Sequence, residues 1–131
     1  MRDLPSSLVL AYLGDAVLEL YVRKRLVAGG PALVRSLHRA AAARVSAAAQ
    51  AAVWSELEDE LTPEETAVAR RARNAQPKHA VRGSRPEHHL STALEAVLGY
   101  LYLLGQQERL DQLLERIWEL GSRSEEEKPC T

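Results

Sequence analysis

The stretch from Leu8 to Arg23, LVLAYLGDAVLELYVR, constrains the fold more than any other part of this chain. Wound as a helix, it points leucine, valine and tyrosine side chains in every direction, and a helix that is apolar all round must be buried on all sides. Gly14 and Asp15 interrupt this apolar run. A lone buried carboxylate is costly unless a cation or a donor compensates it, and such a conflict is expected at a functional site.

Length and charge limit what the chain can be. Its 131 residues make one domain, and hydrophobic and charged fractions of 46% and 27% are those of an ordinary globular protein. The formal net charge of −1 argues against a protein that coats nucleic acid indiscriminately, but it is compatible with a local basic patch. The one cysteine, Cys130, allows no internal disulfide, and no apolar run approaches the roughly 20 residues of a membrane span. We therefore expect a cytoplasmic protein.

The apolar periodicity predicts helices along the chain and a strand nowhere, so we expect an all-α bundle. Gly29-Gly30-Pro31 is expected to end the first helix and Gly121 the last one. The sequence thus predicts one domain over residues 1–121 and a polar, disordered tail over residues 122–131. The predicted helices cover residues 8–27, residues 32–57 with a possible bend near Ser46, a segment beginning at Thr62, residues 90–104 and residues 109–120.

The sign of the charge changes in the middle of the chain. The charged side chains of residues 56–65 are all acidic, which we interpret as helix-end charges and solvated surface. Residues 70–89 are rich in arginine and histidine, and Pro77, Gly83 and Pro86 predict a long exposed loop there. Basic side chains on such a loop suit phosphate contacts, with a merely solvated loop as the alternative. The candidate RNA-contacting residues are Arg70, Arg71, Arg73, Asn74 and Lys78.

The predicted helix over residues 90–104 repeats the pattern of the first one, because it is almost entirely apolar and carries a single carboxylate, Glu95. Two buried helices in a small domain almost must touch. If they cross at Gly14 and Gly99, the carboxylates of Asp15 and Glu95 meet. Paired buried acids repel unless a cation lies between them, and oxygen ligands favour Mg²⁺, with Mn²⁺ as a possible substitute. The alternative is that both acids are structural and hydrogen-bonded.

The two acidic segments resemble the ribonuclease III family. YLGDAVLEL around Asp15 is similar to the family's signature on its first catalytic helix, and STALEAVLGYLYL around Glu95 is similar to its second acidic motif. From Leu8 to Leu120 the chain is similar, more closely, to the short bacterial branch, Mini-ribonuclease III. The supporting segments, in chain order, are LAYLGDAVLELYVR, Leu37-His38, VSAAAQA at residues 45–51, RRARNA at residues 70–75 and STALEAVLGYLYL at residues 91–103.

The resemblance implies an all-α endonuclease domain that works as a two-fold homodimer and cuts double-stranded RNA with Mg²⁺. It implies that Asp15 and Glu95 are the catalytic acids that bind the metal. In the short branch the double-stranded-RNA-binding domain is absent, and the substrate associated with the branch is precursor 23S ribosomal RNA. The dimer has independent support, because a chain of this size cannot easily bury the first helix on every side by itself.

Some positions depart from the full-length enzymes of the family. Ala11 and Thr92 stand where those enzymes carry two further acids, which leaves the number of bound ions open. Glu19 could be a third acid of the group, but its spacing favours an ion pair with Arg23. The role of His88 is also left open. Two rival functions remain at this point: a non-catalytic RNA-binding or ribosome-associated helical dimer, and a helical dimerisation module whose buried acids are structural.

Overall fold

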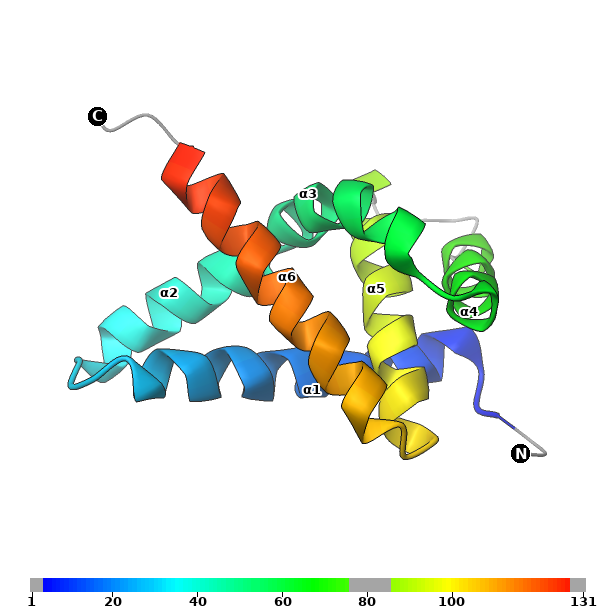
Figure 1. Cartoon of the computed structure of the whole chain (residues 1–131), viewed down its shortest axis with the longest axis horizontal. Coiled ribbons are helices and arrows are strands. Elements are labelled where there is room, and N and C mark those ends of the chain that lie inside the picture. Colours follow the sequence, from blue (N-terminus) through cyan, green and yellow to red (C-terminus); the bar gives the residue numbers. More distant parts are fainter. Residues whose placement is uncertain (1–3, 76–85, 128–131) are drawn as a thin grey trace.

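The computed structural model describes residues 4–75 and 86–127, with side chains up to residue 123, and it is all-helical over these ranges. The predicted all-α fold is therefore confirmed (Figure 1). No described helix is long and apolar enough to cross a membrane. The elements are α1 (Ser7–Ala28), α2 (Val34–Val45), α3 (Ala47–Leu57), a single 3₁₀ turn η1 (Glu58–Glu60), α4 (Pro63–Asn74), α5 (Pro86–Leu103) and α6 (Gln107–Glu127).

Helix α5, and not α1, is the centre of the bundle. It packs against α1, α3, α4 and α6 (Figure 1). Its residues from Ser91 to Leu94 and from Ala96 to Gly99 are all buried. Helix α1 buries one face, which includes Leu18, against this core. The prediction that α1 is buried on all sides is wrong for a single chain, since Tyr12 is 83% and Leu20 70% exposed.

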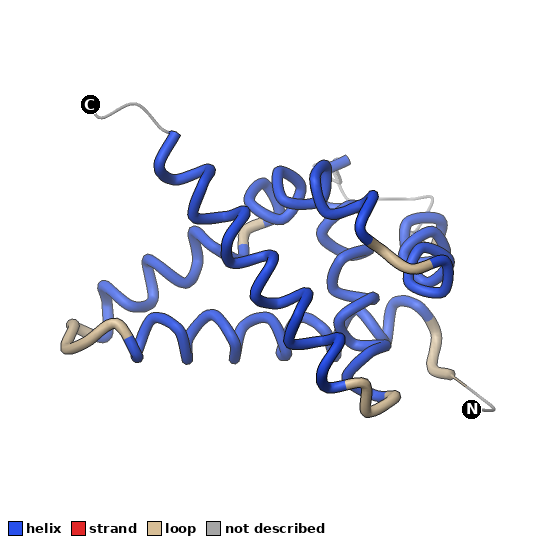
Figure 2. The backbone as a smooth tube through the Cα atoms, in the orientation of Figure 1, coloured by secondary structure: helices blue, strands red, loops and turns tan. Residues whose placement is uncertain are grey.

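The helix starts follow the local sequence. Ser6 caps α1, because its hydroxyl accepts a hydrogen bond from the Val9 amide. Thr62 and Glu65 form a complete capping box at the start of α4, with a proline in the first turn. The possible bend near Ser46 is confirmed as a break: Ser46 is extended and separates α2 from α3, and its hydroxyl caps α3 (Figure 2).

The predicted loop over residues 70–89 is wrong at both ends. Helix α4 continues to Asn74, because Val68, Ala69 and Ala72 extend its buried face, so Arg70, Arg71 and Arg73 lie on a helix. Helix α5 begins at Pro86, a residue that a first helical turn tolerates well. Residues 76–85, and with them the candidate Lys78, lie outside the described residues.

Helix α6 does not end at the predicted Gly121 but runs to Glu127, past the proposed boundary between domain and tail. Gly121 has a packing role instead: a Cβ at this position would lie 2.7 Å from the Nη1 atom of Arg44. The guanidinium of Arg44 donates hydrogen bonds to the carbonyl of Trp118 and to the hydroxyl of Ser122. The glycine therefore admits a side chain from α2 to the surface of α6, and residues 128–131 are not described.

Candidate functional site

The two most apolar helices cross at their glycines, as the sequence predicted. A Cβ added at Gly14 of α1 would overlap the backbone carbonyl of Glu95, and a Cβ added at Gly99 of α5 would overlap the carbonyl of Leu10. Both glycines are buried. Because neither position has room for a methyl group, the backbones of α1 and α5 approach more closely here than side chains would permit.

This crossing brings Asp15 and Glu95 together. Asp15 lies on the exposed surface of α1, whereas Glu95 is partly buried on α5. The pKa of the Glu95 carboxyl is raised to about 7, mainly by burial, with smaller contributions from the charge of Asp15, its hydrogen bond to Glu95 and the charge of Glu19. Opposing these, a hydrogen bond from Gln50 favours the ionised form. Without a cation, the two carboxyls share their site at a clear cost in repulsion.

Glu19 stands near this pair but is already engaged. Its carboxylate accepts a hydrogen bond of 3.1 Å from the guanidinium of Arg23, one turn along α1, which confirms the favoured prediction. Among the described residues, no group of three or more histidine, cysteine, aspartate or glutamate side chains is arranged to hold a metal ion. The close acids are thus the pair Asp15 and Glu95, with Glu19 turned toward its own arginine.

The two positions where the longer enzymes carry acids hold groups that cannot replace them. Ala11 is buried and offers only a methyl group. The hydroxyl of Thr92 donates to the carbonyl of His88 at 2.9 Å, so its proton is committed within α5. The imidazole of His88 is on the exposed first turn of that helix.

The donor set nevertheless fits a hard divalent cation. Two carboxylates on separate helices present oxygen ligands, which Mg²⁺ and Mn²⁺ prefer. A cation between Asp15 and Glu95 would relieve the repulsion that raises the pKa of Glu95. Since Asp15 is exposed, water can complete the coordination sphere.

The described basic candidates line the end of α4. Arg70, Arg71, Arg73 and Asn74 are all exposed in the last turns of this helix. Arg73 and Asn74 line two surface hollows of about 330 and 300 Å³, one extending toward α3 and the other toward the start of α5. Helix α4 packs against α5, and it also touches α1.

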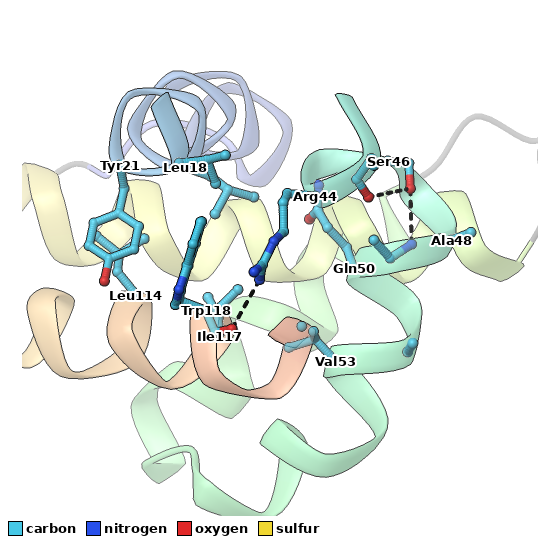
Figure 3. A pocket seen from close by; sticks show the side chains of 15 residues that line it. Leu18, Tyr21, Arg44, Ser46, Ala48, Gln50, Val53, Leu114, Ile117 and Trp118 are labelled. Carbon is cyan, nitrogen blue, oxygen red and sulfur yellow. Dashed lines mark hydrogen bonds between the residues drawn. The ribbon is translucent and has the colours of Figure 1, made fainter. Parts of the chain in front are cut away.

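Gln50 is the residue of this site that sequence reasoning missed. It is only 2% exposed, and its side-chain amide donates hydrogen bonds to Glu95 Oε2 at 3.0 Å and to the Val45 carbonyl at 2.9 Å. The available signal was a glutamine surrounded by alanines in a segment that packs closely. A cavity of about 240 Å³ also reaches Gln50, but neither Asp15 nor Glu95 lines it (Figure 3).

Comparison with known proteins finds chains that are similar to this one. Residues 8–106 match the model of the Ribonuclease III domain. A Mini-ribonuclease 3 from Symbiobacterium thermophilum is 49% identical over 109 residues, which cover 82% of this chain and 84% of the relative. A Mini-ribonuclease 3 from Thermoanaerobacter sp. is 41% identical over 111 residues, 84% of this chain and 78% of the relative. A crystal structure of a protein from Fusobacterium nucleatum superposes with a TM-score of 0.76 at 31% identity, covering 90% of this chain and 94% of that one.

Proposed function

This chain belongs to the ribonuclease III family and is an endoribonuclease of double-stranded RNA, and from that premise we propose that Asp15 and Glu95 hold the Mg²⁺ ion at which the RNA is cut. The observation that carries this proposal is the crossing of α1 and α5 at Gly14 and Gly99, which leaves two carboxyls side by side. From the resemblance to the short branch of the family, we also propose precursor 23S ribosomal RNA as the substrate and the cytoplasm as the location.

The chain's own residues have distinct tasks in this reaction. Asp15 is exposed at the surface and faces the RNA. Glu95 accepts a hydrogen bond from the buried side-chain amide of Gln50. Asp15 and Glu95 would hold the Mg²⁺ ion, which would activate water for attack on the phosphodiester and stabilise charge on the leaving oxygen. Mn²⁺ has the same ligand preference and could substitute for it. Glu19 stays paired with Arg23.

The C-terminal end of α4 is the proposed RNA-binding surface. A-form RNA is recognised mainly through its shape, phosphates and ribose hydroxyls, which suits exposed arginines on a rigid helix. The residues we assign to phosphate contacts are Arg70, Arg71, Arg73 and Asn74. Lys78 joins them on sequence grounds alone.

We assign the exposed apolar side of α1 to the partner subunit of a two-fold homodimer. Val9, Tyr12, Leu20 and Val27 are 52–83% exposed on this side of the helix. A contiguous apolar stripe of this kind is typical of a subunit interface. A two-fold axis beside α1 places two copies of Asp15 along one groove, one for each strand of a duplex. Tyr12→Asp should therefore shift the protein from dimer to monomer in sedimentation velocity runs, and an unchanged sedimentation coefficient would count against this face.

Cleavage of a duplex RNA, with Mg²⁺ and with chelator, tests the function. Asp15→Asn and Glu95→Gln should abolish cleavage while circular dichroism and sedimentation remain those of the wild type. Glu64→Gln is the matched control, because Glu64 is an exposed acid at the start of α4. Full activity in either site variant would refute the assignment of the acids. RNA binding without cleavage by the wild type would favour the non-catalytic dimer instead.

A further inference from the structure

Gln50 is a buried glutamine that the reaction described so far does not use. It lies in the first turn of α3 and is 2% exposed, although the segment around it is rich in alanine. Burying a primary amide is unfavourable unless its hydrogen bonds are made. The partners of its side-chain amide group, Glu95 Oε2 and the Val45 carbonyl, belong to two other helices, α5 and α2.

The break between α2 and α3 creates this arrangement. Helix α2 ends at Val45, so the Val45 carbonyl has lost its partner in the next helical turn. Ser46 turns the chain and caps α3 through a hydrogen bond of 3.1 Å from the Ala49 amide. Gln50 follows one turn later and reaches back to the Val45 carbonyl. Residues 45–51 therefore combine the end of α2, the Ser46 cap of α3 and the Gln50 side chain that bonds back to the Val45 carbonyl.

The hydrogen bonds fix which way the amide of Gln50 faces. Its contacts are to the Val45 carbonyl, which can only accept, and to Glu95 Oε2, which accepts in the ionised form of the acid that binds a metal. The reversed amide would place Oε1 against these two acceptors. In the observed orientation Oε1 is buried without a partner among the described residues. The amide thus leaves its own oxygen unsatisfied in order to donate twice.

We propose that Gln50 is a positioning residue that holds the Glu95 carboxylate in the orientation in which it binds the metal with Asp15. This inference rests on the proposed function of the two acids. The amide donates to Oε2 of Glu95, so Oε1 of this carboxyl is not engaged by Gln50. Groups that orient a metal ligand in this way commonly contribute 10- to 100-fold in metal affinity or activity, by order of magnitude.

Titration of the protein with Mn²⁺ in the absence of RNA, with free Mn²⁺ measured by electron paramagnetic resonance, tests the proposal. Gln50→Met has nearly the same volume and no donor, and we expect it to weaken Mn²⁺ binding about tenfold. Its cleavage rate should recover at about tenfold higher metal concentration. A merely structural glutamine would move neither the binding curve nor the metal concentration needed for cleavage.

Val53→Ala is the matched control, because Val53 is buried on the same helix and lines the same cavity as Gln50 (Figure 3), and its side chain has no hydrogen-bonding group to offer either acid. It should lower the melting temperature and leave Mn²⁺ binding at the wild-type level. Gln50→Asn keeps a buried amide but is one methylene too short to reach both partners, so it carries the test if the methionine variant does not fold. Wild-type Mn²⁺ affinity in a folded variant of Gln50 would overturn the proposal.

The failure of this proposal can be told apart from failure of the proposed function. Glu95→Gln is titrated in parallel, because Glu95 is itself one of the proposed ligands. If the wild type binds Mn²⁺ more tightly than Glu95→Gln while Gln50→Met equals the wild type, only the role of Gln50 is refuted. If the wild type and Glu95→Gln bind alike, the metal site is refuted and the positioning role falls with it.

Discussion

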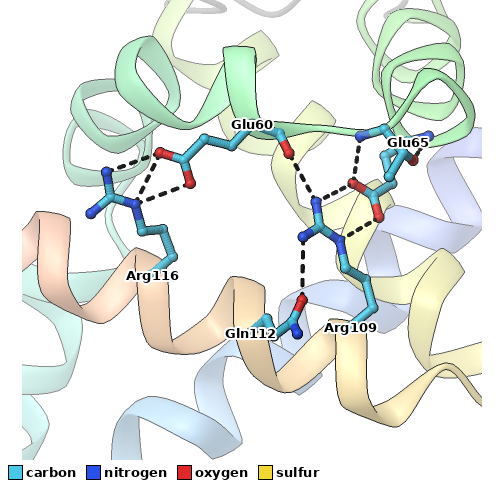
Figure 4. A network of polar contacts seen from close by, with 6 residues as sticks. Glu60, Glu65, Arg109, Gln112 and Arg116 are labelled. Carbon is cyan, nitrogen blue, oxygen red and sulfur yellow. Dashed lines mark hydrogen bonds and ion pairs between the residues drawn. The ribbon is translucent and has the colours of Figure 1, made fainter.

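Replacing Arg109 by methionine should show how the domain keeps α4 in place against α6. The guanidinium of Arg109 donates to both carboxylate oxygens of Glu65, at 2.9 and 2.8 Å, and to the Glu60 carbonyl at 3.0 Å (Figure 4). Glu65 is 2% exposed and also accepts a hydrogen bond from the Thr62 amide. The Arg109→Met variant therefore leaves the Glu65 carboxylate buried at the start of α4 without its cationic partner.

The expected loss in the free energy of unfolding follows from the burial of Glu65, one partner of the ion pair with Arg109. Removing one partner of a buried ion pair costs about 3–5 kcal/mol. The Arg109 side chain is 28% exposed and Glu65 keeps its bond from Thr62, so we expect the lower end, about 3 kcal/mol at pH 7. The matched control is Arg116→Met, because Arg116 pairs with Glu60, whose side chain is 39% exposed, and water can replace that contact.

The pH dependence has a defined sign. Burial raises the pKa of Glu65, but the hydrogen bonds and charge of Arg109 and the Thr62 amide outweigh burial and hold this pKa below its ordinary value. A depressed pKa in the folded state stabilises the protein above the unfolded value of about 4.3, and this stability is lost as the pH falls through the folded value. The cost of Arg109→Met should therefore be largest near neutral pH and should shrink in acid.

Urea unfolding at fixed protein concentration, at pH 7 and at several pH values below 4.5, measures this cost. Arg109→Met should lose clearly more stability than Arg116→Met at pH 7. Adding Glu65→Gln to Arg109→Met should restore part of the loss, because the unpaired charge is then gone. Equal losses in the two arginine variants, or a loss that does not diminish in acid, would refute the reasoning.

Three further predictions concern the site. Gly14→Ala forces a methyl group into the helix crossing, so it should cost about 1–3 kcal/mol in urea unfolding and sharply reduce cleavage; wild-type values would contradict the close approach. Replacing Arg70, Arg71 and Arg73 by alanine should weaken duplex binding. The slope of the logarithm of the binding constant against the logarithm of the salt concentration should become shallower by about 0.9 for each lost phosphate contact. An unchanged slope would exclude α4 from the RNA-binding surface. Because the folded pKa of Glu95 is raised to about 7, the folded state binds the extra proton, and metal-free protein should lose stability as the pH rises from about 4.5 to 7. Melting curves in chelator should show this loss in the wild type and not in Glu95→Gln.

The meeting of the two acids could be predicted because it depends on residues that break a local rule. Gly14 and Gly99 weaken otherwise strong apolar helices, and each lies four or fewer residues from a carboxylate. A glycine retained in a buried helix marks a place where another backbone comes close, and the structure confirms this. Proximity of Asp15 and Glu95 follows from the crossing alone, without knowledge of any loop.

Other features could not be predicted, because they depend on tertiary packing. The extent of α4 is set by the burial of Ala69 and Ala72, which the basic residues between and beyond them conceal in the sequence. In the sequence Gly121 predicts the end of a helix, whereas in the structure it makes room for the side chain of Arg44. Gln50 could not be assigned because its partners belong to two other helices, and neither contact leaves a periodic signal.

The presence of only two close acids bears on whether the domain needs its metal in order to fold. Asp15 and Glu95 repel, but the raised pKa of Glu95 means that one proton can replace the cation near neutral pH. Ala11 and Thr92 add no further charge to this cluster, and Glu19 is paired with Arg23. The metal-free domain therefore avoids the repulsion that four clustered carboxylates would produce. A site of this kind can stay folded and empty, and then exchange its proton for a metal ion, so metal affinity should rise with pH while the fold remains intact in chelator.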